Sequence, residues 1–84
     1  MWRLTMKRME IRLSVHVQMR FYERNIDFDH VKKAIKDPDA KYPDARGLKV
    51  VRIVGVKKIV VIYWISLSRH QSYIYHVITA YYID

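Results

Sequence analysis

The eight residues from Lys58 to Ile65 read KIVVIYWI. Every residue after Lys58 is apolar or aromatic, and β-branched side chains predominate, so both faces of an extended chain here would prefer to leave water. The run shows no 3.6-residue period and is too short to cross a membrane as a helix. It therefore predicts a central strand that is paired on both edges and covered on at least one face.

Two more β-rich runs lie on either side of this strand in the sequence. Upstream, residues 47–54 lead into it through Gly55, and glycine is the residue best able to adopt a positive φ in a tight connection. Downstream, a polar turn precedes a strand predicted over residues 72–80, within an aromatic and β-branched run that reads YIYHVITAYY from Tyr73 to Tyr82. Because short connections join antiparallel neighbours, the three runs predict an antiparallel meander.

The chain before this meander predicts an edge strand followed by a helix. Alternating apolar and polar residues predict a half-exposed strand over residues 9–13. Ser14 then offers an N-cap for a helix over residues 15–24. The apolar stripe expected to pack on the sheet consists of Val15, Met19, Tyr22 and the following Ile26.

A second helix is predicted over residues 28–36, with Asp27 as its N-cap and Asn25 as the C-cap of the first helix. Residues 37–46 contain both prolines and predict a loop. Together the elements predict a single α+β domain over residues 1–84. Two N-terminal helices are expected to pack on one face of a twisted antiparallel sheet, with a short N-terminal strand at its edge.

Composition excludes several classes of protein. The chain has no cysteine and four scattered histidines, so it offers no disulfide framework, no thiolate nucleophile and no zinc-type ligand spacing, and we expect neither a metal nor a cofactor. Basic residues interrupt the apolar residues near the N-terminus, so we expect no signal peptide, no membrane span and a cytoplasmic location. A chain of 84 residues buries only ~60–65% of its unfolded surface, which is compatible with a homodimer.

The net charge is +8, and the positive charge is concentrated toward the two ends of the sequence. Residues 1–24 carry six Lys or Arg against two Glu, and residues 46–84 carry six against one Asp. If these two parts adjoin in the fold, their combined field attracts a polyanion such as nucleic acid. The alternative is that the charge serves only solubility.

The order of the segments resembles a known group of nucleases. The run HVQMRFYERNIDFDHVKKAIKDP (residues 16–38) is followed by a Gly-led strand, the strongly apolar strand and a last strand that reads HVITAYYI (residues 76–83). Over residues 11–83 this combination is similar to RelE-like and BrnT-like toxin nucleases and to related short domains of unknown function. These belong to the barnase, EndoU, colicin and RelE superfamily of metal-independent ribonucleases. Tyr82 departs from the pattern, since those domains often have Pro at this point.

The resemblance implies an RNA substrate, either free or on the ribosome, and a cognate antitoxin protein as a partner. It also singles out Thr79 and the pair Tyr81–Tyr82 on the final strand as site residues. The catalytic set varies widely across this superfamily, so the fold alone does not imply activity.

Metal-independent RNA cleavage requires a proton-transfer group near the 2′-OH and cations beside the phosphate. His16 is the candidate acid or base, because an imidazole titrates near neutrality. Arg20 and Arg24 follow at one-turn intervals on the first helix, and a planar guanidinium is well suited to binding phosphate oxygens. The alternative is an ordinary solvated helix flank on which Glu23 pairs with its neighbours.

The final strand supplies the remaining candidates. Period two places Tyr73, Tyr75, Thr79 and Tyr81 on one face, which we assign to the open side of the sheet, where tyrosine rings stack on unpaired bases. Two alternatives stay open: His76 and Tyr82 are the exposed pair instead, or the tyrosines form a cross-strand packing ladder. His30 and His70 are expected to be surface residues.

The sequence therefore predicts a metal-independent endoribonuclease of toxin type that cleaves RNA through attack by the 2′-OH. The alternative is a non-catalytic nucleic-acid-binding or regulatory protein on the same fold, monomeric or dimeric. The catalytic candidates are His16, Arg20, Thr79 and Tyr82. The nucleic-acid-binding candidates are Arg24, Arg46, Arg52, Tyr73, Tyr75 and Tyr81.

Overall fold

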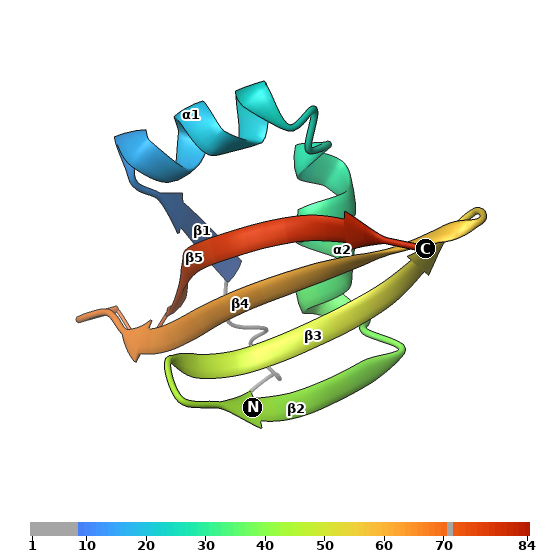
Figure 1. Ribbon diagram of the computed structural model, residues 1–84. Coiled ribbons are helices and arrows are strands. Elements are labelled where there is room, and N and C mark those ends of the chain that lie inside the picture. Colours follow the sequence, from blue (N-terminus) through green and yellow to red (C-terminus); the bar gives the residue numbers. More distant parts are fainter. Residues whose placement is uncertain (1–8, 71) are drawn as a thin grey trace, which may run out of the picture.

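The computed structural model (Figure 1) describes residues 9–70 and 72–84 and has an α+β fold of two helices and a five-stranded mixed sheet. The strand order in the sheet is β1-β5-β4-β3-β2. The elements in chain order are β1 (Met9–Leu13), α1 (Val15–Glu23), α2 (Phe28–Lys36), β2 (Ala40–Asp44), β3 (Gly47–Val54), β4 (Lys57–Leu67) and β5 (Tyr73–Ile83).

β4 lies at the centre of the sheet, as its sequence predicts. It pairs antiparallel with β3 on one edge and with β5 on the other (Figure 1). The positive φ of 65° at Gly55 closes the turn between β3 and β4. The sheet is not wholly antiparallel, however, because β1 pairs parallel with β5. No hairpin turn joins these two strands, since both helices and three strands separate them in sequence, so nothing in the connection requires an antiparallel pair.

The predicted loop over residues 37–46 is also partly wrong, because residues 40–44 form β2. This strand pairs antiparallel with β3 and is the outermost strand on that side of the sheet. Pro43 is compatible with this place, since a proline that cannot donate to the ladder is tolerated on an edge strand. Asp39 fixes the approach to β2, because its backbone N–H donates to the Val51 carbonyl over 2.8 Å and its carboxylate accepts from the Ile53 N–H over 2.7 Å.

The two helices begin at the residues that the sequence predicts. Ser14 caps α1 by accepting from the Val17 N–H over 3.1 Å, and Asp27 caps α2 by accepting from the Asp29 N–H over 2.9 Å. α1 ends one residue earlier than predicted, with Arg24 as its C-cap, and Asn25 takes the left-handed conformation beyond it, with φ 55°. Both helices contribute side chains to one core cluster with β3, β4 and β5.

The prediction of which side of α1 faces the core is wrong. Val17 and Phe21 are buried, whereas the helical residues of the predicted stripe are exposed: Val15 by 72%, Met19 by 58% and Tyr22 by 88%. Only Ile26, which follows the helix, packs against the core as predicted. α1 carries two apolar stripes, and residues two apart on a helix point about 200° away from each other, so only one stripe can face the sheet. Burying the stripe with Phe21 also leaves the Tyr22 hydroxyl in water.

A bulge in β5 changes which of its side chains face the core. Ile62 pairs with Thr79 but the next residue, Tyr63, pairs with Val77, so Ile78 is an extra residue in the ladder. As a result Tyr75 and Val77 before the bulge, and Ala80 and Tyr82 after it, all pack with the core cluster. The predicted open position of Tyr75 is therefore wrong, because unbroken alternation cannot describe a bulged strand.

Candidate active site

Four of the predicted site residues line one cleft between α1 and β5. The cleft has a volume of about 190 Å³. His16 and Arg20 come from α1, Thr79 comes from β5 and Arg46 comes from the turn between β2 and β3. The remaining lining residues are Val17, Phe21, Ile78 and Ala80.

The packing of α1 accounts for the position of its two polar residues. His16 directly precedes the buried Val17, and Arg20 directly precedes the buried Phe21. Since successive helical residues are about 100° apart, burial of Val17 and Phe21 holds His16 and Arg20 on the adjoining flank, one turn from each other. The Ser14 cap anchors the start of the helix, two residues before His16.

Arg46 is held by Asp44, its neighbour in the β2–β3 turn. The Asp44 carboxylate accepts from the Arg46 backbone N–H over 2.9 Å and from its side-chain Nε over 3.2 Å. The backbone hydrogen bond from Arg46, followed by the bond from its guanidinium, lowers the pKa of Asp44 below its usual value. The carboxylate thus orients a guanidinium beside the cleft, and sequence patterns gave no reason to place this residue near α1.

Thr79 reaches the cleft because the bulge lies beside it. Ile78, Thr79 and Ala80, the residues at and after the shift in register, all line the cleft. Together the cleft offers an imidazole for proton transfer, two guanidiniums for an anion and a hydroxyl for a hydrogen bond. Such a set is suited to a phosphodiester, in which charge develops on oxygen as a proton moves.

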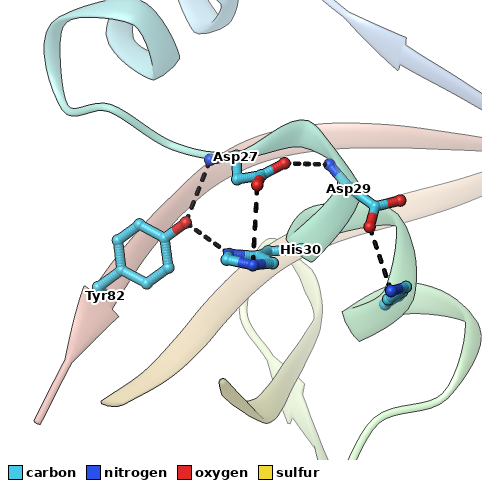
Figure 2. Close-up of polar contacts among 5 residues, drawn as sticks. Asp27, Asp29, His30 and Tyr82 are labelled. Atoms are coloured by element: carbon cyan, nitrogen blue, oxygen red, sulfur yellow. Dashed lines mark hydrogen bonds and ion pairs between the residues drawn. The ribbon is translucent and has the colours of Figure 1, made fainter. Parts of the chain in front are cut away.

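Tyr82, the fourth catalytic candidate, lies in a different contact. Figure 2 shows its hydroxyl oxygen accepting from the Asp27 backbone N–H over 3.1 Å and lying 2.9 Å from Nδ1 of His30. On the other side of the imidazole, the Asp27 carboxylate lies 3.8 Å from Nε2. This cluster ties β5 to the start of α2. The sequence missed it because Tyr82 and His30 are 52 positions apart and neither carries a local signal.

The binding candidates outside the cleft divide by environment. Arg52 donates to the Asp37 carbonyl over 2.6 Å and lies 3.3 Å from its carboxylate, so it links β3 to the end of α2. Arg24 is exposed at the end of α1.

Tyr75 packs on the core with its ring 5.5 Å from that of Tyr63. Tyr73 is exposed and Tyr81 is half-buried on β5. The structure therefore does not bring these residues into the cleft.

Two further observations concern residues 9–70 and 72–84 only. Within them, no three histidine or carboxylate side chains come close enough together to hold a metal ion. Neither of the helices described is long and apolar enough to cross a membrane.

The chain was also compared with known proteins. No family model matches it, and neither the curated proteins nor the solved structures include a significant match. The assignment of a function therefore depends on the geometry of the cleft.

Proposed function

We propose that this protein is a metal-independent endoribonuclease of toxin type, on a RelE-like arrangement with both helices on one face of the sheet. The observation that supports the proposal is the gathering of His16, Arg20, Arg46 and Thr79 around one cleft. These residues come from three parts of the chain, and each supplies a group that cleavage through the 2′-OH requires. The proposed substrate is single-stranded RNA in the cytoplasm, free or on the ribosome, with an antitoxin protein as a partner.

In the proposed reaction His16 accepts the proton of the 2′-OH as its oxygen attacks the neighbouring phosphorus. The O2′–P bond forms and the P–O5′ bond breaks, leaving a 2′,3′-cyclic phosphate and a 5′-hydroxyl whose proton comes from solvent. Arg20 and Arg46 bind the non-bridging phosphate oxygens, on which charge increases in the transition state. The Thr79 hydroxyl donates a further hydrogen bond to the same group.

A second candidate is a non-catalytic nucleic-acid-binding protein that uses the same cleft. The observation that favours it is the position of Tyr82, which bonds to Asp27 and His30 and lies outside the cleft lining. Among the described residues that line the cleft, His16 is then the one imidazole, and no carboxylate lies beside it. A protein that binds nucleic acid without cleaving it needs only the two guanidiniums and the Thr79 hydroxyl of the cleft.

Cleavage in the presence of a chelator separates the two functions. The purified protein should cut single-stranded RNA and leave cyclic phosphate ends, while DNA, which has no 2′-OH, should survive. His16→Ala should slow cleavage by ~10²-fold or more with little change in RNA affinity, because the imidazole acts on proton transfer in the transition state. Arg20→Ala should lower both cleavage and affinity.

His70→Ala is the matched control, because His70 is an exposed histidine in the β4–β5 loop, outside the cleft. It should cleave like the unchanged protein. The assay should be repeated with translating ribosomes as the substrate. If neither substrate is cut, or if His16→Ala and His70→Ala behave alike, the enzyme proposal is wrong and the binding function takes its place.

A further inference from the structure

The outer side of α1 is apolar and exposed to water. Val15, Met19 and Tyr22 form an apolar ridge along the helix, and their exposed fractions are 72%, 58% and 88%. Figure 1 shows α1 at the outer edge of the fold, and the opposite side of the helix packs in the core through Val17 and Phe21. Because residues three and four apart share one side of a helix, the ridge is continuous over about two turns. It is therefore available to another molecule.

A groove lies beside this ridge. It has a volume of about 430 Å³ and is bounded by α1, the end of β1 and the start of α2. Tyr22 belongs both to the ridge and to the wall of the groove, and Phe28, which is 43% exposed, lines the groove as well. The remaining lining residues are Leu13, Gln18, Phe21, Asn25, Ile26 and Asp27. The ridge and the groove therefore form one continuous surface.

The apolar area of this surface is large for a chain of this size. An aromatic side chain has ~150–250 Å² to bury, so Tyr22 and Phe28 leave roughly 200–330 Å² in water at their exposed fractions. With Val15 and Met19 the patch falls in the range of ~300–600 Å² of the largest apolar patches on monomers, which are often functional. A standard interface takes ~800 Å² from each partner. The surface is therefore suited to a weak complex.

The charge of this surface indicates which partner fits it. The chain carries a net charge of +8, yet the described residues that form the ridge or line the groove include no Lys or Arg. RNA needs cations along its phosphate backbone, so RNA does not fit here. Two copies of this chain repel each other through their basic surfaces, and the repulsion is smallest where a surface carries no cations. The charge therefore favours a second copy of the chain.

We propose that two copies of this protein form a weak dimer through this surface, with their α1 helices packed antiparallel. A two-fold contact brings the same patch of both copies together, so the patch must supply both a projecting and a receiving part. The ridge and the groove are these two parts.

The two-fold axis passes between positions 18 and 19 of the two helices. Val15 of each copy then meets Tyr22 of the other, a small side chain against a large one, and enters the groove beside it. Arg20 points about 100° away from Met19, so the candidate clefts of both copies stay open. The interface thus does not depend on the proposed function of the cleft.

Sedimentation velocity of the whole chain tests the dimer. Between about 1 µM and about 1 mM, the range of weak complexes, the monomer should convert to a dimer. Met19→Lys places like charges beside the axis and should stay monomeric over this range. Val56→Lys, the matched control, adds the same charge at a 95% exposed apolar residue of the β3–β4 turn and should dimerise like the unchanged protein. Tyr22→Ala should raise the Kd by roughly tenfold or more, as the loss of a central aromatic contact does.

A charge-swapped pair tests the symmetry of the contact. Met19→Glu should also be monomeric alone, whereas an equimolar mixture of Met19→Lys and Met19→Glu should dimerise, because opposite charges then face each other across the axis. Circular dichroism should show that every variant folds. A chain that is monomeric at every concentration, or a mixture that stays monomeric, overturns the proposal. So does an equal loss of dimer in Val56→Lys and Met19→Lys, because net charge alone then accounts for the change.

The outcome is independent of catalysis. His16→Ala should dimerise like the unchanged protein, and Tyr22→Ala should still cleave RNA as a monomer. A dimer without cleavage refutes the enzyme and keeps the interface. Cleavage by a protein that is monomeric at every concentration refutes the interface and keeps the enzyme.

Discussion

Tyr63 is a tyrosine within the hydrophobic core. It lies on β4 at 1% exposure, with the Tyr75 ring beside it. Burial, with a smaller contribution from Tyr75, raises the pKa of Tyr63 above its usual value, because an ionised phenolate loses its hydration there. The folded protein therefore retains a proton that the unfolded chain releases at lower pH.

This difference predicts how stability changes in alkaline solution. Below the pKa of an unfolded tyrosine, about 10, the contribution of the neutral Tyr63 is fully present, and it is lost as the pH rises through the higher folded pKa. Tyr63→Phe should therefore lose less stability than the unchanged protein between pH 9 and 11. Chemical denaturation at several pH values measures the slope. Tyr22→Phe, at an 88% exposed tyrosine, is the control and should keep the original slope; equal slopes in all three proteins would contradict the expectation.

At the scale of elements, α1 packs one apolar stripe in the core and leaves the other exposed on the surface. Phe21 is buried within the core cluster, whereas Met19, two residues away on the same helix, is 58% exposed. Phe21→Ala should lower the free energy of unfolding by about 3–5 kcal/mol, because it removes a large side chain from a packed site. Met19→Ala should change it by about 0.5 kcal/mol or less.

Urea denaturation of the two variants checks this, with circular dichroism to show that both fold. A loss in Met19→Ala as large as that in Phe21→Ala would mean that the Val15–Met19–Tyr22 stripe packs on the sheet after all. His16 and Arg20 would then not lie on the flank that faces the cleft, so the same measurement also tests the placement of the site.

The same helix shows what the sequence could and could not predict. The starts of α1 and α2 follow from local signals, since Ser14 and Asp27 cap them through their own side chains. The central position of β4 follows from its unbroken apolar run. α1 has two apolar stripes, and its own sequence does not determine which of them packs on the sheet. That depends on the tertiary packing of the whole domain. The bulge at Ile78 and the parallel pairing of β1 likewise depend on partners distant in sequence.

The candidate cleft exists only at the scale of the whole molecule. His16 and Thr79 were proposed from the sequence as members of one site, and both line it. Arg46 was proposed only as a general phosphate contact, because a turn residue gives no sign of which strand or helix it will face. Tyr82, by contrast, was separated from this site by its hydrogen bonds to the start of α2. Three segments, α1, the β2–β3 turn and β5, must all fold before the four groups meet.

The salt dependence of RNA binding should show whether these cations act locally or only as part of the net charge of +8. Each phosphate neutralised on a single strand contributes ~0.7 to the slope of log K against log salt. If Arg20 and Arg46 each bind a phosphate in the cleft, Arg20→Gln and Arg46→Gln should each lower the slope by about that amount. Lys32→Gln and Lys36→Gln remove the same charge from exposed positions on α2, outside the cleft, and should leave the slope nearly unchanged.

Titrations of a 2′-O-methyl RNA at several salt concentrations measure the slopes of all four variants. If RNA is attracted only by the overall positive field of the protein, all four variants should lower the slope equally, because only the total charge then matters. That result would contradict the cleft as the RNA-binding site even if the protein bound RNA tightly.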